Sequence, residues 1–155
     1  MAGLRPIDIS EAERLGNLYG EEHPELDQAF KVFTVENEHS EVAFRVTDVV
    51  LHLRGKGTAV VAPIGIPYAA KTLLKPSEQL DLHSASRVYD IVTQHKHSVE
   101  SVGDPVSVEY AVYYQPEPET TFIGGKFCLF VPVTLTDVSG SVGIRYSSYD
   151  RRSVP

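Results

Sequence analysis

Three runs of alternating apolar and polar residues lie between residues 106 and 146. Their apolar positions are Val106, Val108, Tyr110, Val112 and Tyr114 in the first run, Phe127, Leu129, Val131, Val133 and Leu135 in the second, and Val142, Ile144 and Tyr146 in the third. Successive side chains of a strand point to opposite faces, so a period of two predicts strands with one buried face. Sheets that are solvated on one side are usually antiparallel, and the runs therefore predict an antiparallel meander.

The opposite face of the first two runs is not uniformly polar, because it carries Ala111, Tyr113, Cys128 and Phe130. An apolar patch on a sheet needs a cover, which is either a helix of the same subunit or a second subunit. Aromatic residues are enriched at interfaces between proteins. We therefore predict a candidate interface at Tyr113, Cys128 and Phe130. The apolar tip of the following loop, Phe122 and Ile123, either forms a second contact or folds back onto the core.

Further elements are predicted upstream of these runs. Strands are expected at residues 30–35, 42–53 and 58–62. Within the second of these strands the alternation changes phase after Thr47 and Asp48, which is typical of a β-bulge or of two short strands joined at a bend. A short helix is expected at residues 68–74.

The main helix is predicted at residues 84–96, with Ser84 as its N-cap and apolar residues at spacings of three and four. A shorter helix begins near Ser10, within a candidate N-terminal arm of residues 1–25. Residues 150–155 are polar and are predicted to form a loose tail. Pro132 cannot donate a backbone hydrogen bond, so its strand is expected at a sheet edge or a bulge.

These elements predict an α+β fold in one domain of 155 residues. The expected architecture is mostly antiparallel, a sandwich or an open barrel of about six to seven strands, with a helix against one side or end. A chain of this length, 42% of it apolar, is large enough to bury a substantial core.

Composition narrows the classes of partner. The net charge is −7, which disfavours nucleic acid or an anionic membrane as the main partner, because both require an excess of Lys and Arg. A nucleic-acid site would need four cations to converge, Arg54, Lys56, Arg151 and Arg152. The single cysteine excludes an internal disulfide and a multi-cysteine zinc site. No apolar run is long enough to span a membrane, so a location in the cytoplasm or within a particle assembled in cells, such as a virion, is expected.

Candidate chemistry is sparse in the sequence. Two acid–base pairs are conceivable, Asp48 with His52 and Asp81 with His83. In the competing interpretation, His52 lies on a solvent-exposed face of a sheet and has no chemical role. Asp81 and His83 then belong to the segment that caps the start of the main helix. No motif for a metal, a nucleotide or a nucleophile is complete, so neither catalytic nor metal-binding residues are predicted, and no cofactor.

We therefore expect a non-enzymatic, self-associating structural or interaction protein, of the kind that builds the shell or matrix of a virus or phage. The alternative is a small barrel-like protein, binding a ligand in an apolar pocket or acting on it as an enzyme. An open cavity lined by the inward-facing residues would favour the alternative. A dry core, with the face of Tyr113 and Phe130 covered by a second copy, would favour self-association.

Overall fold

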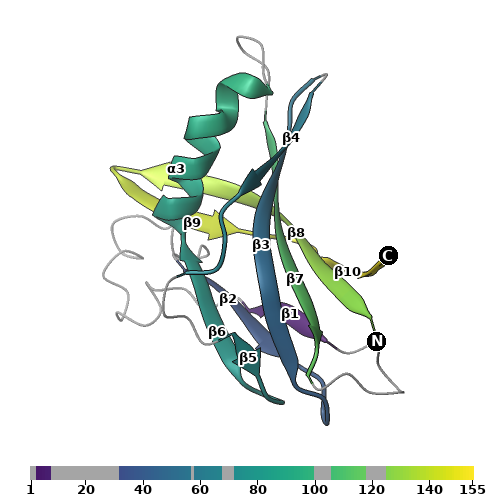
Figure 1. Ribbon diagram of the computed structural model, residues 1–155. Helices are drawn as coiled ribbons and strands as arrows, with labels where there is room; N and C mark the ends of the chain where they lie inside the picture. Colours follow the sequence, from purple (N-terminus) through teal and green to yellow (C-terminus); the bar gives the residue numbers. More distant parts are fainter. Residues whose placement is uncertain (1–2, 8–31, 57, 68–71, 100–105, 118–124) are drawn as a thin grey trace.

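The computed structural model describes residues 3–7, 32–56, 58–67, 72–99, 106–117 and 125–155 (Figure 1). Within them the strands are β1 (Leu4–Ile7), β2 (Val32–Asn37), β3 (Phe44–Arg54), β4 (Ala59–Pro63), β5 (Leu73–Leu74), β6 (Gln79–Ser84), β7 (Ser107–Pro116), β8 (Lys126–Val138), β9 (Ser141–Arg145) and β10 (Asp150–Val154). One α-helix, α3 (Ala85–His95), follows β6 directly and ends in a 3₁₀ turn, Lys96–Ser98. The predicted α+β class is confirmed, although ten strands are described rather than six or seven.

The strands form two antiparallel sheets. The large sheet has the order β10-β8-β7-β3-β4, with β5 attached to β3 and β9 to β8. The small sheet has the order β1-β2-β6. Neither sheet closes into a barrel. In Figure 1, α3 continues from β6 and lies against β9 and β4, on the same side of the large sheet as the small sheet.

The core lies between the large sheet on one side and the small sheet with α3 on the other. Leu51, Tyr110 and Val131 form one row across β3, β7 and β8, and all three are fully buried. Phe33 of β2 packs on this row, with its ring centroid 4.0 Å from that of Tyr110. The alternating residues predicted to face inward therefore do so, and the meander of β7, β8 and β9 is confirmed.

The phase change in the second predicted strand is a β-bulge. β3 is one strand of 11 residues, and its register with β7 shifts between Val46 and Asp48. The carboxylate of Asp48 accepts a hydrogen bond from the backbone N–H of Val49, at 2.8 Å. The bulge explains why Val46 and Val49 are both buried although their spacing is odd.

Pro132 was predicted to lie at a sheet edge or a bulge. β8 as a whole is not an edge strand, because it lies between β7 and β10. The residue nevertheless occupies a local gap. On the side of β8 away from β7, pairing with β10 ends at Phe130 and pairing with β9 begins at Thr134. A proline is tolerated there because no strand on that side requires its missing N–H.

The chain ends also differ from the sequence prediction. Residues 150–154 are not a loose tail but form β10, paired with β8 from Phe130 to Lys126. Leu4–Ile7 pairs with β2 in the same chain, so this part of the predicted arm belongs to the small sheet. The predicted N-terminal helix lies outside the described residues. Leu73–Leu74, predicted at the end of a short helix, is strand β5.

The main helix agrees with its prediction. It spans Ala85–His95, and the hydroxyl of Ser84 accepts a hydrogen bond from the backbone N–H of Arg87 at 3.1 Å. Its buried residues are those of the predicted apolar stripe, Ala85, Val88, Ile91 and Val92. The stripe faces the core between the large and small sheets.

Removing residues 150–155 is expected to lower the free energy of unfolding by about 1–3 kcal/mol, because a paired strand and the ion pair of Arg151 with Glu38 are lost. The freed edge of β8 should also promote aggregation. Urea unfolding followed by circular dichroism, with light scattering, measures both effects. A truncated chain as stable and as soluble as the full one would show that β10 adds nothing to the fold.

Candidate functional site

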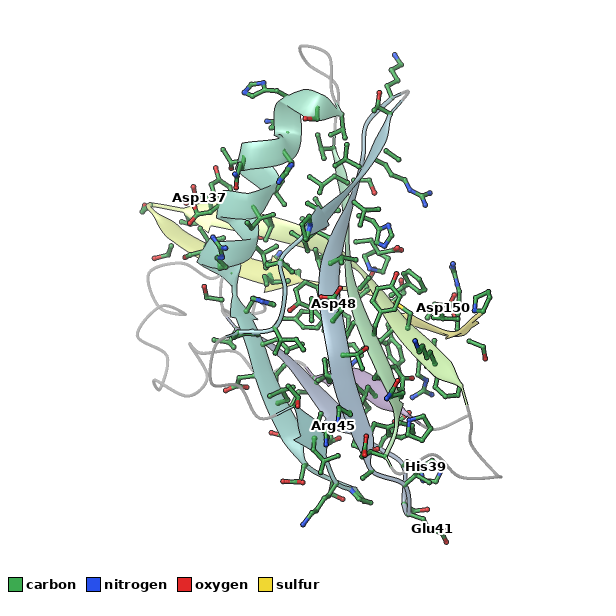
Figure 2. All side chains as sticks on the ribbon, in the orientation of Figure 1. His39, Glu41, Arg45, Asp48, Asp137 and Asp150 are labelled. Atoms are coloured by element: carbon green, nitrogen blue, oxygen red, sulfur yellow. The ribbon has the colours of Figure 1, made fainter. Side chains whose placement is uncertain are left out.

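The face of the large sheet that points away from the small sheet and α3 is called the outer face here. Three rows of paired residues cross it, led by His52, Val50 and Asp48 of β3. The row of His52 also contains Val61, Glu109 and Pro132. The row of Val50 also contains Pro63, Ala111, Phe130 and Asp150. The row of Asp48 also contains Tyr113, Cys128 and Arg152. Figure 2 labels Asp48 on β3 and Asp150 on β10, the strand at one edge of the large sheet.

A second apolar cluster, separate from the core, occupies the outer face. Val50, Ala111 and Cys128 are its buried members, and larger side chains, Tyr113, Phe130 and Val154, are partly buried around them. Val61 of β4 is 56% exposed on the same face. The three residues predicted as a candidate interface, Tyr113, Cys128 and Phe130, thus lie together. Phe122 and Ile123 lie outside the described residues.

Polar groups of the outer face are arranged around Phe130. The guanidinium of Arg152 stacks over its ring at 4.7 Å and donates a hydrogen bond to Asp150 at 2.7 Å. The His52 ring lies 5.9 Å from that of Phe130, and its Nε2 is buried without a hydrogen-bond partner. The face therefore combines an apolar centre with charged residues on β3, β7 and β10.

Cys128 is not an activated nucleophile. Burial raises the pKa of its thiol to about 12, although a hydrogen bond with Tyr113 opposes this shift. Burial likewise raises the pKa of Tyr113. Because the thiolate is the reactive form, Cys128 acts here as a small packing residue.

The first acid–base pair that the sequence suggested is not assembled. Asp48 and His52 are four residues apart on one strand, which separates them by roughly 13 Å. The Asp48 carboxylate is instead engaged by the backbone of Val49.

The second pair is also divided. The exposed Asp81 accepts a hydrogen bond from the Thr34 hydroxyl at 2.7 Å, whereas His83 is only 5% exposed. A register shift between β2 and β6 falls between these positions and leaves both Leu82 and His83 buried.

The structure instead joins His83 to Tyr110, a pair that spans the two sheets. The Tyr110 hydroxyl contacts Nδ1 of His83, and the ring also hydrogen-bonds the backbone of Gly65. The N–H of Gly65 is already donated to Val49, so the ring donates to the Gly65 carbonyl. Nδ1 must then accept from the tyrosine hydroxyl, which fixes a neutral tautomer. In the sequence, the only signal for this pair is a tyrosine in an apolar run, which needs a polar partner when buried.

Burial sets the ionisation of this pair. It lowers the pKa of His83 to about 4, and the nearby Arg87 charge adds to that shift while the Gly65 bond opposes it. Burial also raises the pKa of the fully buried Tyr110 well above its usual range. Neither group lines a described cavity, so we assign the pair to holding the two sheets together.

A cavity of about 880 Å³ lies elsewhere, between α3, the start of β7, the middle of β8 and the residues that end and follow β9. A second hollow of about 500 Å³ is formed by Phe44, Tyr114 and Phe127 with the segment 149–153. The predicted inward-facing residues do not enclose an open central cavity, because Phe44, Tyr110 and Leu129 are buried in a continuous core.

The cations considered for nucleic acid do not converge. Arg152 lies in the same row of the sheet as Asp48. Arg54 lies six residues further along β3, so roughly 20 Å separates the row of Arg54 from that of Arg152. Arg151 points toward the small sheet, where it pairs with Glu38. The outer face therefore has no continuous basic stripe among the described residues.

No described helix has the length and apolar character needed to cross a membrane. Within the described ranges, no three His, Cys, Asp or Glu side chains lie together in a way that would hold a metal ion. Comparisons of the chain with protein-family models, with curated proteins and with solved structures find no match.

Proposed function

We propose that this protein is a structural or interaction subunit that associates with further copies of itself through the outer face of its large sheet. The observation that carries the proposal is the second apolar cluster, built around Val50, Ala111 and Cys128 on the side of the sheet opposite the core. The partly buried Tyr113, Phe130 and Val154 around this centre, with the exposed Val61, leave apolar surface on the outer face, and apolar surface patches mark interaction sites. A shell or matrix, such as that of a virus or phage, is an assembly that would use it.

Strand pairing on the outer face suits a second copy. A two-fold axis parallel to the strands, running between β7 and β8, would place β7 of one copy over β8 of the other. Phe130 of each copy would then lie over the position of Ala111 in its partner, and Tyr113 over that of Cys128. Ala111 and Cys128 are fully buried within the subunit, so the larger, partly buried side chains around them would make the contacts. Each contact would occur twice, as an isologous interface requires.

Charge complementarity supports the same axis. It would bring β3 of one copy over β10 of the other, and Asp48 and Arg152 belong to one row. The carboxylate and the guanidinium would then face each other across the interface, twice per dimer. Complementary charges of this kind fix register and suppress wrong partners more than they add affinity.

The size of the face is adequate for a modest interface. Five strands about 4.8 Å apart, with six residues of about 3.4 Å each, give roughly 500 Å² in projection. Standard interfaces bury about 800 Å² of accessible surface per partner, which is of the same order for a corrugated surface. Sheets that pack face to face in this way cross at about 30°.

Substituting Phe130→Glu is expected to abolish association and leave the fold intact. In the associated protein the new charge would be buried at the centre of the interface, whereas in the monomer this position is only partly buried. Size-exclusion chromatography with light scattering gives the mass, and circular dichroism gives the fold. Gln94→Glu, which adds the same charge on the exposed side of α3, is the matched control and should associate like the wild type.

A charge exchange tests the register. Asp48→Arg should weaken association, and adding Arg152→Asp to it should restore association in part. A wild-type chain that stays monomeric at high concentration contradicts self-association outright. If the double variant does not regain association while Phe130→Glu still prevents it, the outer face is the interface but the proposed two-fold axis is wrong.

A further inference from the structure

The cavity of about 880 Å³ beside α3 has an unusual charge for this chain. The protein carries a net charge of −7, yet none of the described residues that line this cavity is acidic. Two of them are cationic, Lys96 at the end of α3 and Arg145 at the end of β9. The described lining therefore carries cationic side chains and no acidic one, which favours an anionic ligand.

Arg145 supplies a second, independent observation. Its Nε is buried and has no hydrogen-bond partner. Among the described residues no carboxylate forms an ion pair with it. Leaving a buried donor of a charged group unpaired is costly, and such groups in native structures call for an explanation. Arg145 also lines the cavity, so an anion bound there would meet a guanidinium whose Nε has no acceptor.

The remaining walls are of three kinds. Hydroxyl groups come from Thr93 on α3, Ser107 on β7 and Thr134 on β8, and from Ser147 after β9. Two aromatic side chains, Tyr89 and Tyr146, also line the cavity. The aliphatic lining is Val92, Val106, Val108, Pro132, Val133 and Leu135. An apolar lining with a few polar groups, in a volume between about 300 and 1,000 Å³, is typical of sites for small organic ligands.

We propose that this cavity binds an aliphatic monocarboxylate, with its carboxylate held by the guanidinium of Arg145 beside Lys96 and its hydrocarbon chain along the valines and Leu135. Arg presents a planar fork that matches a carboxylate. A single guanidinium suits a monoanion better than a dianionic phosphate. Aliphatic side chains outnumber the two tyrosines in the lining, which favours a hydrocarbon chain.

Titration calorimetry with decanoate tests the proposal on the full-length protein. Wild-type protein should bind decanoate at one site per chain, and decanol, which has the same chain without the charge, should bind about 10-fold or more weakly. Acetate, which has the charge without the chain, should not compete with decanoate. Equal binding of decanol, or full competition by acetate, would overturn the proposed site.

Arg145→Gln should weaken decanoate binding roughly 10-fold to 100-fold, the range expected for losing a hydrogen bond to a charged group. Arg145→Lys keeps the charge and should lose less. Arg54→Gln removes an exposed arginine outside the cavity and is the matched control, which should bind like the wild type. Wild-type affinity in Arg145→Gln would contradict the proposal. If that variant does not fold, the comparison of decanoate, decanol and acetate on wild-type protein decides alone.

The result is independent of self-association. The same titration on the Phe130→Glu variant should give wild-type affinity, because Phe130 does not line this cavity. Binding that disappears together with association would contradict a site contained within one subunit.

Discussion

Phe33→Ala is expected to lower the free energy of unfolding by about 3–5 kcal/mol. Phe33 is fully buried on β2, and its ring packs 4.0 Å from the ring of Tyr110 on β7, where the small sheet meets the large one. Truncation removes the buried ring and leaves a cavity that two sheets cannot easily close. Because domains of this size are stable by only about 5–15 kcal/mol, the loss would be visible as a large shift of the urea midpoint.

Phe130→Ala is the matched comparison, since it makes the same change on the other side of the large sheet. Phe130 is only partly buried and lies over small residues, so its loss should cost less than half as much. The pair of variants thus measures which face of the sheet is core. At a concentration where the chain is monomeric, equal costs would mean that both faces are core, and the outer face would then not be free to bind a second copy.

The parts of this fold that follow from local geometry could be predicted from the sequence. Alternation alone identified β7, β8 and β9 and their buried faces, because a strand imposes a period of two wherever it lies. The phase change near Thr47 likewise located the irregularity in β3, which is a bulge and not a bend between two strands. The same pattern also placed Tyr113, Cys128 and Phe130 on one face.

The parts that depend on distant residues could not be predicted. β10 has no alternating pattern, and it is held by pairing with β8 and by the ion pair of Arg151 with Glu38, 113 positions earlier in the chain. Similarly, the position of Pro132 is tolerated only because β10 ends and β9 begins on either side of it. Neither relation leaves a local signal in the sequence.

The pair of His83 and Tyr110 in the core also depends on residues that are distant in the sequence. Alternation placed His83 on the same face as Asp81, but the register shift between β2 and β6 leaves His83 buried. Its partner Tyr110 is 27 positions away. The cavity beside α3 was also missed, because it depends on how the helix stands over β8 and β9.

Acidification from pH 7 to about pH 5 is expected to lower the free energy of unfolding by about 2 kcal/mol through His83 alone. Burial lowers its pKa from 6.5 to about 4 in the folded protein, so the unfolded chain binds this proton first as the pH falls. The contribution of His83 is therefore fully present above pH 6.5 and is lost as the pH falls toward 4. Urea unfolding at several pH values between 5 and 7 measures the change.

His83→Gln isolates this contribution from that of every other titrating group. The glutamine amide cannot titrate, but it can still accept a hydrogen bond from Tyr110 and donate one to the Gly65 carbonyl. The slope of the free energy of unfolding against pH reports how many protons the chain takes up on unfolding. Between pH 5 and 6.5 this number should be smaller in the variant by up to one proton. Identical slopes in the two proteins would mean that His83 is protonated as readily in the folded chain as in the unfolded one. A buried, neutral histidine joining the two sheets would then be excluded.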